Sequence, residues 1–411
     1  MLYASIHLCI SSDLIGHFCL YIDNFSNTYN FTYNDAGHLT HDDKKDSQNN
    51  VIFGRDYSYD YAGNRTSETR DAASITYTYN DANQLVSRVI SGGETISCTY
   101  DDNGNLTQQV STLNGTTNYG YDLENRLVSA VTPSSSAYYG YSGDGRRTYS
   151  YIDNNEVEYI YDGLTPLIER NSPGSYLAAY TRLPGAPGGI GGLISSHDGT
   201  NTLYYHDSNL GNVNQVTNSA GVVIQTYDYD AFGYITAQTG ALTAKYAYKT
   251  KEYSPETGLV FFGARYYNPL IGRFITPDPS GMVDGPNVYL YCLNDTINEI
   301  DLWGLETRTP SQGNPNSSQS FSDGKGGKTV REFGSDGKAI RDTDYGHNHG
   351  AGDPHAHDWD WSGKDPKRLD GRAVPKGWKF PGMPFPDPFP IIIFPMELLW
   401  EILGLGCQGV A

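Results

Sequence analysis

The octet YDDNGNLT occupies residues 100–107, and the architecture of the first half of the chain follows from it. Variants of this octet stand at residues 33–40, 59–66 and 121–128. The tyrosines that open these and the intervening units recur at steps of 20 to 26 residues, at Tyr33, Tyr59, Tyr79, Tyr100, Tyr121, Tyr141 and Tyr161. Such a period is typical of a repeat array, in which each unit buries its face only against its neighbours.

Each unit has the chemistry of a tight turn between two strands. In most units Tyr is followed by Asp or Asn, usually by a Gly-Asn or Gly-His pair, and then by an aliphatic residue, while the units at residues 80–84 and 142–146 vary the turn but keep the spacing. Gly and Asn tolerate the positive φ that a hairpin turn needs, whereas Tyr, Thr, Val and Ile favour the flanking strands. We therefore predict a run of about seven β-hairpins over residues 29–171.

Composition agrees with a β-rich protein and separates the tail from the body. The 411 residues include 34 Tyr and 46 Gly, and the net charge is −19. This acidity argues against a body that grips nucleic acid or an anionic membrane. Residues 1–305 hold 16 Lys or Arg against 33 Asp or Glu, whereas residues 306–411 hold 12 against 14. The tail is therefore a different kind of module.

The cysteines and the two ends of the chain are less informative. Five scattered cysteines do not form the pattern of a disulfide framework or of a Cys-based zinc site. Residues 1–28 read as the remnant of an upstream repeat, or as a weak signal-like segment that lacks a basic start. Residues 391–403 are apolar but contain Pro395 and two glutamates, so we predict a short amphipathic helix and no transmembrane segment.

The Tyr-Asp units resemble the YD repeats of the RHS (rearrangement hot spot) family, which also occur in teneurins and in the C subunits of insecticidal toxin complexes. Seven ordered boxes resemble the RHS repeat-associated core, within residues 172–305. They are YYHDSNLGN (204–212), YDYDAFG (227–233), EYSPETGL (252–259), GARYYNP (263–269), GRFITPDP (272–279), NVYLY (287–291) and DLWGL (301–305).

The resemblance implies a mainly β fold, in which the hairpin ribbon forms a curved shell that carries a variable, usually toxic C-terminal effector. It also implies an aspartyl-type self-cleavage between Leu305 and Glu306, with Asp278 and Asp301 as catalytic carboxylates. Arg273 and Asp284 lie nearby in sequence. This chain has Leu302 where the family box usually has Pro, and the alternative role of both aspartates is to cap turns.

The shell expected here is incomplete, because family shells are several times longer. Its open edges favour association with other RHS shell segments. A delivered toxin of this family is secreted or presented at the cell surface, and its partners include a cognate immunity protein. The alternative is a noncatalytic YD-repeat protein that binds carbohydrate or a partner chain at the cell surface, or an orphan RHS fragment.

The composition changes after residue 305. Residues 306–322 read as a linker rich in Ser, Asn, Gln, Pro and Gly, and residues 323–411 as a small α+β domain. Residues 327–334 and 338–345, separated by an Asp-Gly turn, predict a β-hairpin.

Four of the ten histidines follow this hairpin as two His-x-His pairs: His347, His349, His355 and His357. Alternate residues of a strand point to the same side, and the Gly-Ala-Gly-Asp-Pro connection can bring the two pairs together.

Three interpretations of this cluster stay open. The first is a divalent-metal site for an ion of the Zn, Mn or Ni type, with Asp353, Asp358 or Asp344 as further ligands. The second is a metal-free site in which two histidines act as base and acid on a phosphodiester, with Asp358 beside them. The third is a structural loop. The basic residues from Lys364 to Lys379 could contact the phosphates of a nucleic acid, so the first two interpretations predict a nuclease.

Overall fold

The computed structural model describes residues 6–12, 16–22, 27–70, 73–171, 174–183, 192–208, 211–240, 245–305, 307–308, 318–322, 328–334, 338–345, 355–360, 367–370 and 372–373. Within these ranges the chain is built from β-strands and two short 3-10 turns, which agrees with the predicted mainly β class. No helix among the described residues has the length and apolarity needed to cross a lipid bilayer.

A single sheet of 22 strands, called the shell below, contains most of the chain. Its strands are β1 (Ile6–Ser12), β2 (Gly16–Ile22), β3 (Thr28–Tyr33), β4 (Leu39–Lys45), β5 (Val51–Tyr59), β6 (Arg65–Arg70), β7 (Ala73–Tyr79), β8 (Leu85–Ile90), β9 (Thr95–Tyr100), β10 (Leu106–Ser111), β11 (Gly115–Tyr121), β12 (Leu127–Val131), β13 (Ser136–Tyr141), β14 (Arg147–Ile152), β15 (Asn155–Asp162), β16 (Thr165–Arg170), β17 (Tyr176–Leu183), β18 (Gly192–His197), β19 (Thr202–Asp207), β20 (Val213–Asn218), β21 (Val223–Tyr229) and β22 (Ile235–Gly240). Each strand pairs antiparallel with the next strand along the chain, from β1 and β2 to β21 and β22.

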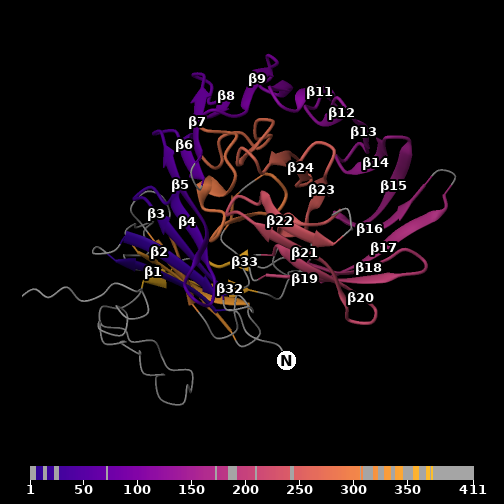
Figure 1. Cartoon of the computed structure of the whole chain (residues 1–411). Helices are drawn as coiled ribbons and strands as arrows, with labels where there is room; N and C mark the ends of the chain where they lie inside the picture. The colour runs from indigo at the N-terminus through magenta and orange to yellow at the C-terminus, as the bar shows by residue number, and fades with distance from the viewer. Residues whose placement is uncertain are drawn as a thin grey trace, which may run out of the picture.

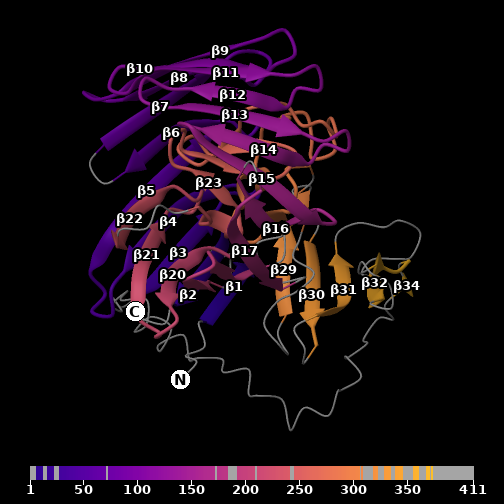
Figure 2. The same cartoon turned by 90° about the vertical axis from the view of Figure 1, so that its right-hand side faces the viewer.

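The predicted hairpins are strands β3 to β16, and the sheet continues beyond them on both sides. Strands β1 and β2 extend it upstream, and β17 to β22 extend it into the region expected to be the core. The sheet bends into a ring (Figure 1), and residues 245–305, called the plug below, lie inside that ring (Figures 1 and 2).

The plug has short elements joined by irregular backbone. They are η1 (Tyr248–Thr250), β23 (Glu252–Ser254), β24 (Leu259–Phe261), β25 (Tyr266–Asn268), β26 (Arg273–Phe274), η2 (Cys292–Asn294) and β27 (Ile300–Asp301), with β28 (Thr307–Arg308) pairing onto β27. Plug residues such as Leu259, Phe261 and Ile275 share one buried cluster with the shell residues Ile75 and Leu85. The main core of the molecule therefore lies between the shell and its own plug.

The tail forms a separate sheet of six strands, called the tail sheet below. They are β29 (Ser318–Ser322), β30 (Lys328–Phe333), β31 (Ala339–Tyr345), β32 (His355–Asp360), β33 (Lys367–Arg368) and β34 (Arg372–Ala373). The predicted hairpin is the antiparallel pair of β30 and β31. Strand β29 lies against β1, so the tail sheet adjoins the first strands of the shell (Figure 2). The predicted helix at residues 391–403 lies outside the described residues.

The repeat tyrosines link each hairpin to the preceding one. The Tyr59 hydroxyl donates to the Leu39 carbonyl at 2.7 Å, and the Tyr121 hydroxyl donates to the Leu106 carbonyl at 2.8 Å. The same bond recurs from Tyr79 to Arg65, from Tyr141 to Leu127, from Tyr161 to Arg147 and from Tyr229 to Val213. Every acceptor is the carbonyl group of the first residue in the second strand of a hairpin, called the return strand below. The same hydrogen bond therefore sets the same offset between successive hairpins.

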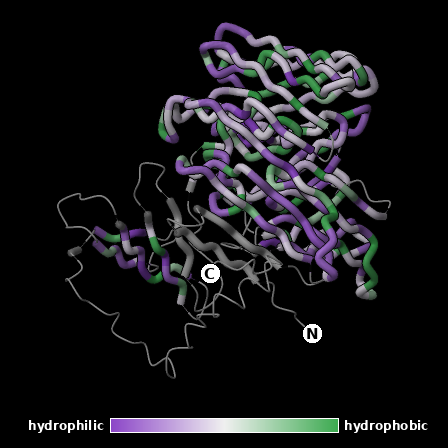
Figure 3. Tube along the Cα trace, turned by 60° about the vertical axis from the view of Figure 1, so that its left-hand side comes forward, coloured by the Kyte–Doolittle hydropathy of each residue, from purple (hydrophilic) through white to green (hydrophobic). Residues whose placement is uncertain are grey.

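The polar residue after the tyrosine, an Asp, Asn or Ser, holds the turn in most units. In the hairpin of β5 and β6, one carboxylate oxygen of Asp60 accepts the backbone N–H groups of Ala62 and Asn64, each at 2.9 Å. The Asn64 side chain donates to the other oxygen, and Gly63 takes a φ of +76° that favours glycine. Along β7, for example, buried and exposed residues alternate. Figure 3 shows hydrophilic and hydrophobic residues mixed throughout the shell.

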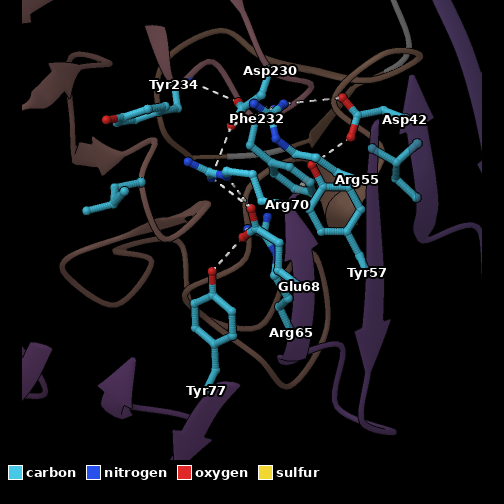
Figure 4. A network of polar contacts seen from close by, with 12 residues as sticks. Asp42, Arg55, Tyr57, Arg65, Glu68, Arg70, Tyr77, Asp230, Phe232 and Tyr234 are labelled. Carbon is cyan, nitrogen blue, oxygen red and sulfur yellow. Dashed lines mark hydrogen bonds and ion pairs between the residues drawn. The ribbon is translucent and has the colours of Figure 1, made fainter. Parts of the chain in front are cut away.

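Side chains of an early part of the ring, strands β4 to β6, contact a late part, strand β21 and the residue that follows it. The Lys44 ammonium of β4 binds the Asp228 carboxylate of β21 at 2.7 Å. Asp230 follows β21 and lies 3.8 Å from the Arg55 guanidinium and 3.7 Å from that of Arg70 (Figure 4). Arg55 also lies 3.5 Å from the Asp42 carboxylate, so two buried carboxylates share one cation. These residues form what we call the seam of the shell.

We predict that Tyr121→Phe lowers the stability of the chain by about 1–3 kcal/mol, because the substitution leaves the Leu106 carbonyl without its donor. Thermal unfolding followed by circular dichroism measures the effect. Tyr138→Phe is the matched control, since this neighbouring tyrosine is 46% exposed. Equal melting temperatures for the two variants would contradict the role given to the repeat tyrosine.

At the seam, the raised pKa of Asp42 should make the folded chain less stable as the pH rises, which is the opposite of acid denaturation. Burial, together with the charge of Asp230, raises the pKa of Asp42 from 3.8 to about 6 although Arg55, the Tyr57 hydroxyl and His41 oppose this shift. The folded chain therefore holds a proton that the unfolded chain has lost, and the resulting stabilisation is present at low pH and disappears as the pH rises through about 6. Between pH ~5 and ~7.5 this amounts to about 1 kcal/mol.

We expect Asp42→Asn to remove that share of the pH dependence, because an amide does not titrate and still accepts a hydrogen bond from Tyr57. Denaturant unfolding of wild type and variant at the two pH values is the measurement. A variant whose loss of stability between them equals that of wild type would show that Asp42 is not the titrating group.

Candidate self-cleavage and metal sites

The plug brings the two predicted catalytic carboxylates together on one arginine. The Arg265 Nη2 atom lies 2.7 Å from Asp278 Oδ2 and 3.4 Å from Asp301 Oδ2. Arg265 is 2% exposed, and its guanidinium lies 3.7 Å from the centroid of the Phe274 ring. Asp278 is placed by its own N–H, which donates to the Val288 carbonyl at 3.0 Å. Asp301 is placed by the pairing of β27 with β28.

The two carboxylates have different surroundings. Burial raises the pKa of Asp278, and the nearby charges of Asp301 and Asp284 raise it further, while Arg265 opposes the shift. Asp301 instead accepts three backbone N–H groups at one oxygen, from Trp303 at 3.1 Å, Gly304 at 2.7 Å and Leu305 at 3.1 Å. Asp278 is therefore suited to carry a proton, while backbone donors hold one oxygen of Asp301, and acid–base chemistry can use this difference in surroundings.

Hydrogen bonds hold the described residues on both sides of the predicted scissile bond, between β27 and β28. The Arg265 Nε–H donates to the Gly304 carbonyl at 2.5 Å, and the Thr307 N–H beyond the bond donates to Asp284 Oδ2 at 2.7 Å. Gly304 has a φ of +73°, and a Cβ there would lie 3.2 Å from the backbone nitrogen of Arg265, so both the backbone conformation and the close approach favour glycine. Glu306 lies outside the described residues.

A cavity of about 390 Å³ opens beside this loop. Trp303 and Leu305 line it from the loop, Lys251 from the plug, and Arg146 and Tyr161 from the shell. Water can therefore be held next to the residue that precedes the predicted scissile bond.

The sequence did not single out Arg265, although its box was part of the core pattern. Arg273, which is nearer to Asp278 in sequence, instead ties the plug to the shell by donating to the Asn64 side chain at 3.3 Å and the Asn83 carbonyl at 2.5 Å. The distance along the sequence could not predict which arginine binds the two carboxylates, because the irregular backbone of the plug decides which arginine faces them.

In the tail sheet, the second His-x-His pair meets an aspartate of the neighbouring strand. Asp344 of β31 pairs with His355 of β32, and His355 and His357 point to the same face. Asp344 Oδ2 lies 3.5 Å from His355 Nε2 and 3.3 Å from His357 Nε2. One ligand atom from each of these three residues lies within 4.8 Å of the others. They are called the His/Asp cluster below.

Charged neighbours on the same face of the sheet hold the cluster. The Thr329 hydroxyl donates to Asp344 Oδ1 at 2.6 Å, and the Arg368 guanidinium binds Asp344 Oδ2. Arg368 also binds Asp342 at 2.8 Å, while Arg331 binds the same carboxylate at 2.7 Å. Burial would raise the pKa of Asp344, but the bonds from Thr329 and Arg368 and the charges of Arg368 and His357 lower it.

These residues fit a divalent metal of the borderline class. His357 Nδ1 lies 2.7 Å from the Leu369 carbonyl, which orients the Nε2 atom toward Asp344 as in many metal-ligating histidines. Two imidazoles and one carboxylate are a ligand set used by catalytic zinc and iron sites. A metal at this point would compete with Arg368 for Asp344.

The other predicted site residues do not join the cluster. Asp358 points to the opposite face of β32 and binds Arg341 at 2.8 Å, so the structure separates it from His355 and His357. His347, His349 and Asp353 lie outside the described residues.

Two family models match the chain, the teneurin YD-shell over residues 190–289 and the RHS repeat over residues 100–137. Among curated proteins, the chain is 32% identical to the tRNA3(Ser)-specific nuclease WapA of Bacillus spizizenii over 262 residues, covering 60% of this chain and 11% of that protein. It is 25% identical to the double-stranded DNA deaminase toxin A of Burkholderia cenocepacia over 318 residues, covering 69% of this chain and 21% of that protein.

Among solved structures, the crystal structure of TcdB2-TccC3 without its hypervariable C-terminal region matches with a TM-score of 0.39 and 21% identity, over 72% of this chain and 19% of that chain. The chain thus spans only a minor part of the length of the curated relatives that it matches.

Proposed function

Because this chain is an RHS/YD-repeat protein, we propose that it is the shell segment and effector of an RHS-type polymorphic toxin that cleaves itself after Leu305. The placement of Asp278 and Asp301 on one arginine, beside the loop that ends at Leu305, is the observation that carries the cleavage. As a delivered effector, the protein would act outside the cell that makes it, and a cognate immunity protein would be its partner.

The proposed cleavage is a hydrolysis. Water adds to the carbonyl carbon of Leu305, and the Asp301 carboxylate accepts a proton from that water. Asp278 donates its proton, the C–N bond to Glu306 breaks, and the leaving nitrogen becomes an amine. Arg265 keeps both carboxylates in place and offsets the negative charge that develops on the carbonyl oxygen.

For this cleavage, we expect the intact mass of purified wild type to show a product that ends at Leu305. Asp278→Asn should leave the chain uncut, because the amide cannot supply the proton. Asp122→Asn is the matched control, since Asp122 also accepts backbone N–H groups in a turn but lies in the shell. A wild type that stays whole, or an Asp278→Asn chain that is cut like wild type, would sink the proposal.

For the tail, we propose a metal-dependent nuclease built on the His/Asp cluster. Two observations support it. Ligand atoms of Asp344, His355 and His357 lie within 4.8 Å of one another. Arg368 binds the carboxylate of Asp344 and is a cation that can also bind a phosphate. Bound metal would supply a Lewis acid and an activated water. Asp344 and the two imidazoles would hold the metal, and the exposed side chains of Lys367 and Arg368 would contact the nucleic-acid backbone.

The proposal predicts that the full chain binds about one divalent ion and slows the growth of a bacterial host, and that His357→Ala reduces the metal affinity by about 10–100-fold and restores growth. Arg368→Ala should keep or strengthen metal binding, because Asp344 loses a competing cation. Metal titration and growth curves measure these effects, with His206→Ala in the shell as control. A chain with neither metal nor toxicity would favour the noncatalytic surface-binding role.

A further inference from the structure

Two buried lysines stand two residues apart in the plug, and each donates to a different carbonyl. Lys249 is 3% exposed, and its ammonium donates to the Thr296 carbonyl at 3.1 Å. Lys251 is 1% exposed, and its ammonium donates to the Leu302 carbonyl at 2.6 Å. Only the second of these two acceptors belongs to the loop that leads to the predicted scissile bond.

The burial of Lys251 is costly and therefore calls for a reason. Its ammonium lies 5.4 Å from the Phe262 ring and 5.5 Å from the Trp303 ring. Burial lowers the pKa of this amine well below its ordinary value, while the charge of Asp301 opposes the shift and that of Arg182 adds to it. An apolar side chain of similar length would fill the same space without desolvating a charge.

We propose that Lys251 is a positioning residue for the self-cleavage proposed above, on which this inference rests. Its amine fixes the Leu302 carbonyl, and Arg265 fixes the Gly304 carbonyl at 2.5 Å. The Asp301 carboxylate binds the N–H of Leu305, so the peptide unit between Gly304 and Leu305 is held at both its oxygen and its nitrogen.

Lys251 completes this set of contacts at the start of the loop. Without it, the Leu302 carbonyl loses its side-chain donor, and the segment between Asp301 and Gly304 can turn away from the carboxylates. A displacement of about 1 Å at a reacting group can slow a reaction by roughly 100-fold. Lys251 also lines the cavity beside Leu305.

The test compares Lys251→Met, Lys251→Arg and the matched control Lys249→Met. Pulse-labelled synthesis of each full chain gives the rate at which the uncut form disappears, and thermal unfolding confirms that each variant folds. We expect Lys251→Met to cleave about 10–100-fold more slowly, Lys251→Arg to recover part of the rate, and Lys249→Met to stay within about twofold of wild type even if it melts earlier.

The pH profile separates positioning from simple destabilisation. Purified uncut Lys251→Met and Lys251→Arg chains are moved to buffers from pH ~5 to ~8, and the rate of cleavage is followed by intact mass. The arginine variant should cleave faster than the methionine variant across this range, because its guanidinium can still donate to the Leu302 carbonyl whereas a thioether cannot.

Each outcome decides the inference. A Lys251→Met chain that cleaves at the wild-type rate, or a Lys249→Met chain that slows as much, overturns the role of Lys251 while leaving self-cleavage in place. A wild type that remains uncut overturns the self-cleavage itself and the role of Lys251 with it.

Discussion

The hydrogen bond from a repeat tyrosine to the first carbonyl of the preceding return strand is the constraint on which the rest of the structure depends. It fixes the offset between hairpins, and it satisfies a hydroxyl whose ring lies against the plug, as with Tyr121 and Leu106. Because the hydroxyl is used within the shell, the ring can be buried without loss. A ribbon of such units presents an aromatic-rich face with interspersed compensated charges, and this face curves around the plug.

Because the interior excludes water, burying a charged side chain there costs free energy. The geometry of the candidate cleavage site depends on which groups compensate these buried charges. Each buried arginine binds a carboxylate, a backbone carbonyl or an aromatic face. Arg265 combines all three, at Asp278, Gly304 and Phe274. The arrangement that stabilises the plug is therefore also the one that holds a loop and two carboxylates in place. Structural packing and the proposed chemistry cannot be separated at this point of the chain.

In the tail sheet, buried charges lie on one face of a small sheet and not between the shell and the plug. Its polar face buries Asp342, Asp344 and His355 in a small sheet, where Arg331 and Arg368 compensate them. Strand periodicity alone predicted that His355 and His357 share a face. The same periodicity puts Asp358 on the opposite face of β32, but it could not predict that Asp344 joins the two histidines, because that depends on the register between β31 and β32. A shift of one residue in that register would turn Asp344 to the other face of the sheet.

The sequence by itself determined the repeat, the turns and the order of the hairpins, because these depend on local propensities and on a period that needs no distant partner. Its family boxes also predicted that Asp278 and Asp301 act together, and the structure places both beside Arg265. Only the tertiary structure decided that Arg265 and not Arg273 joins them, and that Lys251 reaches the Leu302 carbonyl. Such contacts form across irregular backbone, where no periodic rule links sequence distance to position in space.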